Sequence, residues 1–233
     1  MDFRKIMHFE KDSFIKILDS MEDGAFIANA ECQLQYISPA LEKDFGAAEG
    51  KKCWFVPVGA SNELGAMGYL NCAREISEWS GEQGVSFDRV YYAAGSGGTT
   101  AGLVMGNALY DLGAKVRGIN VGEPREEFLK EIEAIIHRAL QRFEVPVRFE
   151  RENLEIIEGY YGKGYGDIPE KISDCIRRVA LSDGLILDPV YTAKAMYGLI
   201  EEEKQIEGGR VLFIHTGGIF SLFAFRDRLN LKL

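Results

Sequence analysis

A glycine-rich segment with two hydroxyl side chains follows an apolar run of strand character. The apolar run covers residues 90–93, and the segment after it is Gly95-Ser96-Gly97-Gly98-Thr99. Glycines allow consecutive backbone N–H groups to converge on one point without a Cβ in the way. The helical pattern that follows adds the positive end of its dipole, and the hydroxyls of Ser96 and Thr99 can join these donors. The pattern favours a phosphate-binding loop over an ordinary strand-to-helix turn.

Apolar strand patterns and helical patterns alternate along the chain after residue 55. This alternation is typical of βαβ units and predicts an α/β fold, with a parallel sheet flanked by helices. We expect strands over 88–93, 115–121, 154–158, 185–187 and 211–215, and helices over 64–79, 100–112, 124–143, 169–181 and 192–204, with a short helix at the C-terminal end.

Three polar or glycine-containing segments follow predicted strands. They are residues 95–98, the segment Asp188-Pro189-Val190-Tyr191-Thr192, and the segment His215-Thr216-Gly217-Gly218. Ligands bind parallel α/β sheets in the crevice outside the carboxyl ends of the strands. We therefore expect these three segments to converge on one site.

Composition limits the classes of function. The chain has 233 residues, 46% of them hydrophobic, and a formal net charge of -9, which argues against a nucleic-acid or anionic-membrane partner. No membrane span or signal peptide is evident, so a cytoplasmic location is expected. The cysteines Cys32, Cys53, Cys72 and Cys175 form no C-x-x-C pair, so no metal site is expected, and Cys72 and Cys175 are predicted core residues.

Taken together, these motifs resemble the pyridoxal-phosphate enzymes of fold type II, specifically the D-cysteine desulfhydrase and 1-aminocyclopropane-1-carboxylate deaminase family. The resemblance implies the large domain of a tryptophan synthase beta-like fold, and pyridoxal 5'-phosphate as cofactor. Tyr191-Thr192 is similar to the desulfhydrase branch, since the deaminase branch has a glutamate after this tyrosine. The segments that carry the resemblance, in the family's order, are residues 56–69, 95–102, 164–166, 187–195 and 215–218.

The resemblance also assigns roles to individual residues. Ser96, Gly97, Gly98 and Thr99 would hold the cofactor phosphate, with the glycines admitting the ligand close to the backbone. Tyr191 would lie against the pyridine ring, and Thr216 would face the ring nitrogen. Tyr165 would be an acid or base on the substrate side, or only an aromatic residue at the rim. The implied reaction is β-elimination of D-cysteine, or a related small amino acid, to pyruvate, ammonia and hydrogen sulfide.

The N-terminal segment has a different character. Residues 8–53 resemble the first half of a PAS sensor domain, with helices expected over 13–21 and 39–45 and strands over 25–30 and 32–38. The expected division is therefore a PAS-like α+β segment at 1–54 and a pyridoxal-phosphate-binding domain at 55–233. The chain looks like two incomplete genes joined near residue 54.

The family's Schiff-base lysine, in a glycine-asparagine-lysine context, and its substrate-carboxylate loop are not found in the sequence. Lys194 follows Tyr191 on a predicted helix and is interpreted as a surface or packing residue. Without that lysine the chemistry loses its nucleophile and base. Three interpretations stay open: a desulfhydrase-like enzyme, an inactive remnant that binds the cofactor, or a PAS-type sensor or interaction fragment. The resemblance allows a homodimer.

Overall fold

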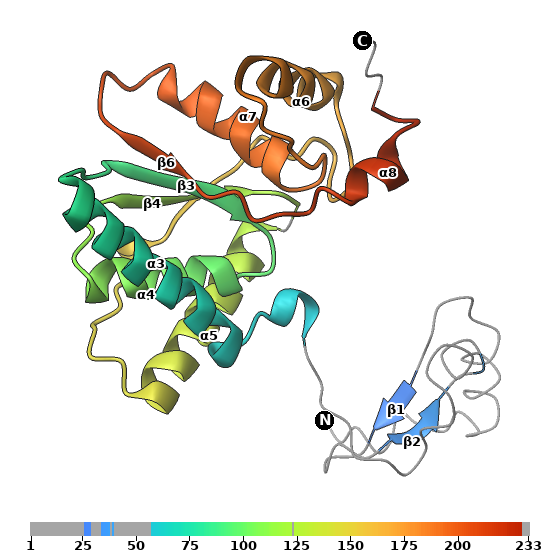
Figure 1. Ribbon diagram of the computed structural model, residues 1–233. Coiled ribbons are helices and arrows are strands. Elements are labelled where there is room, and N and C mark those ends of the chain that lie inside the picture. Colours follow the sequence, from blue (N-terminus) through green and yellow to red (C-terminus); the bar gives the residue numbers. More distant parts are fainter. Residues whose placement is uncertain (1–25, 29–33, 38, 40–56, 123, 230–233) are drawn as a thin grey trace. The chain divides into compact units, whose positions relative to one another are not determined.

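The computed structural model describes residues 26–28, 34–37, 39, 57–122 and 124–229 (Figure 1). The chain divides into two compact units, residues 1–56 and 57–233. In the first unit β1 (Phe26–Ala28) pairs antiparallel with β2 (Leu34–Ile37), and Phe26 lies opposite Ile37. The helices expected over 13–21 and 39–45 fall almost entirely outside the described residues.

The second unit is built on a four-stranded parallel sheet in the order β5-β4-β3-β6. Every residue of β3 is buried, as expected for a strand covered on both faces. Arg89, the first residue of this strand, lies opposite Lys115 of β4 and Val211 of β6. The strands are β3 (Arg89–Ala94), β4 (Lys115–Asn120), β5 (Glu155–Ile157) and β6 (Val211–Phe213).

Helices cover both faces of this sheet. Figure 1 shows α3 (Glu63–Gln83), α4 (Gly98–Leu109) and α5 (Arg125–Phe143) on one face, and α6 (Glu170–Asp183) with α7 (Thr192–Glu203) on the other. The buried residues of α5 recur every three or four positions, which is the stripe expected of a helix with one face on a core. They are Phe128, Leu129, Ile132, Ile135, Ile136 and Ala139.

Short elements complete the second unit. The 3-10 turns are η2 (Val58–Ala60) and η3 (Arg151–Asn153), and the last helix is α8 (Ser221–Phe225). Within the described residues, no helix is both long and apolar enough to cross a membrane.

The predicted fold class, a parallel sheet flanked by helices, is confirmed. One predicted strand is wrong: residues 185–187 join no sheet, although Leu187 is fully buried. This segment packs beside the residues that follow β6, where the carbonyl of Ile186 lies 2.9 Å from His215 Nε2. Of this segment only Leu187 is buried, whereas Ile186 is 48% exposed, so a short apolar run does not by itself indicate a strand.

Candidate functional site

A cavity of about 570 Å³ opens at the carboxyl ends of β3 and β4. It brings together five of the seven residues that the sequence singled out, namely Ser96, Thr99, Tyr165, Tyr191 and Thr216. The other two, Gly97 and Gly98, are buried in the same loop. The three segments expected to follow strands therefore do converge on one crevice. Its remaining lining residues are Val58, Gly59, Tyr69, Ala93, Gly95, Val121, Gly122, Gly217 and Gly218.

The glycine loop leads directly into α4, and Gly97 is the residue before this helix. Gly97 has no side chain to cap the helix, and the first backbone bond runs from Ala101 N to the Gly97 carbonyl. The amides of the first turn, at Gly98 and Thr99, therefore have no acceptor within the helix. Together with the helix dipole they make this end of the cavity suited to an anion.

Gly97 has a packing role that the sequence did not indicate. A Cβ at this position would lie 3.2 Å from Ile132 Cγ1 and 3.4 Å from Ile135 Cδ1, so it would point into the core beneath α5. Gly97 therefore has a packing role beside α5, and its expected role at the cofactor phosphate stays a prediction. Its φ of 93° places it in the left-handed region, which glycine adopts without a steric cost.

Ser61, which precedes α3, contacts the glycine loop through its hydroxyl, although the sequence did not single it out. Its hydroxyl accepts a hydrogen bond from Gly98 N at 3.2 Å and donates one to Ser96 Oγ at 2.6 Å. The residue precedes Asn62, whose side chain caps α3 by accepting from Gly65 N at 2.8 Å. A serine and an asparagine before a helical pattern are a helix-start signal, but that signal does not reveal a contact with a loop 35 residues away.

Tyr191 and Tyr165 form an aromatic wall of the cavity. Their rings meet edge to face with centroids 5.8 Å apart, and their hydroxyls are hydrogen-bonded to each other. The Tyr191 ring lies against the glycine loop, since a Cβ on Gly95 would be 3.6 Å from Tyr191 Cε1. Burial, followed by the hydrogen bond to Tyr165, raises the pKa of Tyr191 well above its usual range. Tyr191 is therefore a neutral hydroxyl at physiological pH, whereas Tyr165 is 62% exposed.

Asp188 anchors the segment that carries Tyr191. Its carboxylate, fully buried, accepts hydrogen bonds from the backbone N–H groups of Val190, Tyr191 and Thr192 at 2.9, 3.0 and 2.6 Å. It therefore satisfies amides at the start of α7, and a carboxylate there also complements the helix dipole. A Cβ on Gly218 would lie 2.9 Å from Asp188 Cγ, so the loop after β6 packs directly on this carboxylate.

His215 shapes the loop that presents Thr216. Its Nδ1 accepts from Gly217 N at 3.1 Å, and its Nε2 lies 2.9 Å from the Ile186 carbonyl. An accepting Nδ1 leaves the proton on Nε2, so the ring is the neutral tautomer that donates to Ile186. His215 thus bridges two loops and fixes the backbone on both sides of Thr216.

Lys194 has no exposed surface, so the interpretation of it as a packing residue is confirmed and the surface alternative is wrong. Its Nζ donates to the carbonyls of Val121 at 3.3 Å and Gly164 at 3.2 Å. Both acceptors are adjacent in sequence to residues that line the cavity. Among the described residues, no lysine lines that cavity itself. Within the same ranges, no group of three or more histidine, cysteine or acidic side chains is placed to bind a metal ion.

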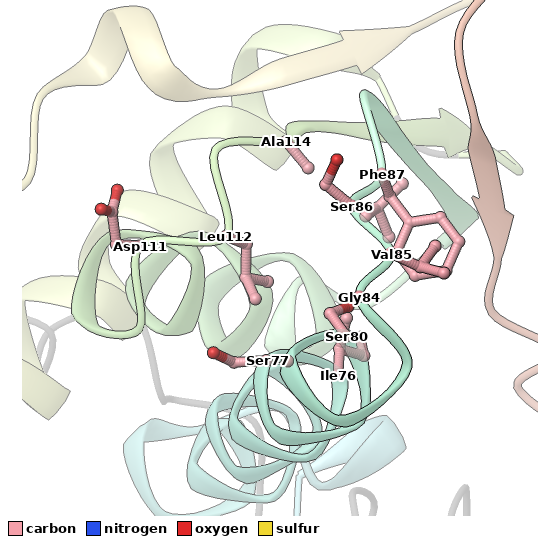
Figure 2. Close-up of a pocket in the computed structure, with 12 residues that line it drawn as sticks. Ile76, Ser77, Ser80, Gly84, Val85, Ser86, Phe87, Asp111, Leu112 and Ala114 are labelled. Carbon is pink, nitrogen blue, oxygen red and sulfur yellow. The ribbon is translucent and has the colours of Figure 1, made fainter.

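A second cavity, of about 350 Å³, lies at the amino ends of β3 and β4 (Figure 2). Its walls come from the C-terminal part of α3, residues 84–87 and residues 111–114. It offers the ends of helices that carry the negative pole of the dipole, and Asp111 is its charged lining residue near them. This chemistry does not suit a phosphate, so the two cavities differ in the ligands that they could accept.

The fold and the first cavity define an α/β protein with a parallel sheet flanked by helices and a crevice at the carboxyl ends of its strands. A family model described as "Pyridoxal-phosphate dependent enzyme" matches residues 35–217. This chain belongs to that family, whose cofactor is pyridoxal phosphate. The match begins inside the segment likened to a PAS domain, and the comparisons do not support the PAS-like interpretation of residues 8–53.

Within this family, the chain is similar to D-cysteine desulfhydrases and 1-aminocyclopropane-1-carboxylate deaminases. The chain is 37% identical over 187 residues to the mitochondrial bifunctional D-cysteine desulfhydrase/1-aminocyclopropane-1-carboxylate deaminase of Arabidopsis thaliana, covering 78% of this chain and 45% of that protein. It is 33% identical over 218 residues to a D-cysteine desulfhydrase of Klebsiella pneumoniae, covering 92% of this chain and 62% of that protein. The crystal structure of an ACC deaminase homologue superposes with a TM-score of 0.70 at 36% identity, covering 81% of this chain and 55% of that one. The chain thus spans about half to three fifths of the length of these relatives.

Proposed function

We propose that residues 57–229 bind pyridoxal phosphate in the first cavity, as the cofactor-binding part of a D-cysteine desulfhydrase-like protein that acts on a small amino acid. The observation that carries the proposal is the convergence of the glycine loop, Tyr191 and Thr216 on one cavity. Its volume lies within the range of sites for small cofactors. The α4 end supplies amide donors for a phosphate, and the tyrosine wall supplies a face for an aromatic ring.

Each residue then has a defined task. Ser96 and Thr99 hold the phosphate together with the amides at the start of α4, Tyr191 supports the ring, and Thr216 offers a neutral hydroxyl to the ring nitrogen. When bound, pyridoxal phosphate withdraws electrons from bonds broken at the α-carbon of an amino acid. Since Tyr191 keeps its proton and hydrogen-bonds to the exposed Tyr165, the pair can pass a proton between the cavity and solvent.

Binding is tested by placing a negative charge in the cradle. Ser96 is exposed, so Ser96→Asp should leave the fold intact while the added carboxylate repels the phosphate. We expect the affinity for pyridoxal phosphate, measured by calorimetric titration, to fall by about 100-fold or more. Ser86→Asp is the matched control, because it adds the same charge at the exposed rim of the second cavity. Equal affinities for the two variants would reject the proposed site.

The proposal includes a limit on catalysis by these 233 residues alone. They contain no lysine in a glycine-asparagine-lysine context, and Lys194 is enclosed by protein. We expect the chain to hold the cofactor without a covalent bond and to release sulfide and pyruvate from D-cysteine no faster than free pyridoxal phosphate does. Borohydride treatment followed by peptide mass spectrometry should find no cofactor attached to a lysine. A clear rate above the free cofactor, lost in Tyr191→Phe, would support the active-enzyme interpretation instead.

A further inference from the structure

Lys194 is a buried lysine whose hydrogen-bond partners lie outside its own helix. It lies in the first turn of α7 and has no exposed surface. Among the described residues, it is one of three buried side chains that carry a positive charge. The other two, Arg89 and Arg117, form ion pairs with glutamates at 2.7 to 3.2 Å. Lys194 instead donates to two backbone carbonyls. Burying an ammonium in this way is costly, and burial does lower the pKa of Lys194.

The two acceptors come from loops that meet at the cavity wall. The carbonyl of Val121 immediately precedes Gly122, and the carbonyl of Gly164 immediately precedes Tyr165. The next residues touch each other, since a Cβ on Gly122 would lie 2.9 Å from both the N and Cα atoms of Tyr165. Two carbonyl dipoles therefore converge on one ammonium just behind this contact. The Gly164 carbonyl also accepts from Asp167 N at 3.2 Å. Without Lys194 the buried Val121 carbonyl would lose this donor, and the link between the two loops would be lost.

The same lysine also reaches the tyrosine wall through its helix. Lys194 is three residues after Tyr191, so it joins the α7 end of the cavity to the two loops that carry Gly122 and Tyr165. The charges of Asp167 and Asp188 favour its protonated form and partly offset the cost of burial. The ammonium is thus fixed at the point where three segments that line the cavity meet.

We propose that Lys194 is a positioning residue of the pyridoxal-phosphate site, which holds the Val121–Gly122 and Gly164–Tyr165 loops against the first turn of α7. This inference rests on the proposed function. Lys194 acts on the part of the cavity that would receive the ring and the amino acid. The phosphate cradle, built by β3 and the start of α4, does not depend on it.

The test uses Lys194→Met, which nearly preserves the length of the side chain but removes its donors, and Lys130→Met as control. Lys130 is an exposed residue of α5, so the control removes the same charge from the surface. Amide hydrogen exchange of the cofactor-free proteins is followed by mass spectrometry. In Lys194→Met we expect exchange at residues 121–122 and 160–166 to become at least tenfold faster, with the α4 segment and the control unchanged. Unchanged exchange in both loops would overturn the inference.

Ligand affinities supply a readout that general destabilisation would not reproduce. For Lys194→Met we expect at least a tenfold loss of affinity for pyridoxal phosphate, with the affinity for inorganic phosphate within twofold of that of the unaltered protein. Equal losses for both ligands would contradict a role confined to the ring side. So would cofactor trapped on Lys194 by borohydride, because the lysine would then be a nucleophile.

Two further outcomes separate this inference from the proposed function. If the unaltered chain does not bind pyridoxal phosphate, the proposed function fails, and hydrogen exchange still decides whether Lys194 joins the loops. If Lys194→Met does not fold, the same readouts are applied to Lys194→Gln, which keeps an amide donor without the charge. An effect in the same direction but smaller than tenfold supports the inference, and none overturns it.

Discussion

The two faces of the parallel sheet are stabilised by different physical means. On the face covered by α4, the contacts are apolar and the helices approach closely, because Gly98, Gly102 and Gly106 recur every fourth residue along α4. A Cβ on Gly102 would lie 2.2 Å from the Ala66 carbonyl oxygen of α3. On the face covered by α7, charged and hydroxyl groups from β3 and β4 reach Glu202 and Glu203 near the end of that helix.

The α7 face carries a hydrogen-bonded network in the interior. Arg89 donates to both oxygens of Glu203 at 2.7 and 2.9 Å, and Tyr91 donates to the same carboxylate at 2.7 Å. Arg117 contacts the Tyr91 hydroxyl and pairs with Glu155 at 2.8 Å. Burial and the bond to Glu203 raise the pKa of Tyr91 well above its usual range, so its hydroxyl stays protonated.

The apolar packing on one face and the hydrogen-bonded network on the other suit the different parts of the cavity that the two faces carry. The α4 face ends in a cradle made of backbone amides, and close packing of two helices is a way to fix backbone positions. The α7 face ends in Tyr191, whose backbone N–H donates to Asp188, and directional hydrogen bonds of this kind orient a side chain at a site. We infer that substitutions on the α4 face destabilise the protein through steric clashes, and substitutions on the α7 face through lost hydrogen bonds. The following predictions test this inference.

The largest effect is expected for Gly102→Ala on the α4 face. The new methyl group would meet backbone atoms of α3, which cannot move aside as a flexible side chain would. We expect a loss of about 3 kcal/mol in the free energy of unfolding, measured in urea. Gly68→Ala is the control, because it makes the same change in α3 with no atom within 4 Å of the new Cβ. It should raise stability by up to about 1 kcal/mol, and equal effects would contradict the close-packing interpretation.

A smaller effect is expected for Glu203→Gln on the α7 face. The amide has only one acceptor oxygen, so it cannot accept from Tyr91 and from both guanidinium nitrogens of Arg89 as the carboxylate does. Loss of a hydrogen-bonded partner for a largely buried charge should cost about 2 kcal/mol in the free energy of unfolding. Glu78→Gln removes a carboxylate from the exposed Arg74–Glu78 pair and should cost under about 0.5 kcal/mol. If both variants lose the same free energy of unfolding, the α7 network contributes no more to stability than a surface ion pair.

The sequence was sufficient for the order of elements and for the three loops at the cavity, because glycine turns and apolar periodicity are local signals. It was not sufficient for Ser61 and Lys194, whose partners lie 30 to 73 residues away and are backbone or hydroxyl groups that any sequence offers. Residues 185–187 were wrongly predicted as a strand, because a short apolar run can occur in a loop that joins no sheet. The packing role of Gly97 was missed for a similar reason, because its neighbours Ile132 and Ile135 belong to α5, more than 30 residues away.

The smallest effect concerns Cys175, in the layer behind the α7 face. The residue is 4% exposed, and burial raises the pKa of its thiol from about 9 to about 11. Between these two pH values the folded chain keeps the thiol proton that the unfolded chain has lost. The contribution of the thiol to the free energy of unfolding is therefore complete below pH 9 and is lost as the pH rises toward 11. We expect about 0.8 kcal/mol of this loss by pH 9.5. Burial and Glu202 raise the pKa of Tyr160 to about 12, which adds a further loss of stability above pH 10.

The measurement is therefore the difference in the free energy of unfolding between the unaltered chain and Cys175→Ala, in urea from pH 8 to 10. Because the variant has no thiol at this position, its stability should fall less steeply with pH, whatever its absolute value. Parallel curves for the two proteins would mean that the thiol titrates as it does in water, and that the layer behind α7 is open to solvent.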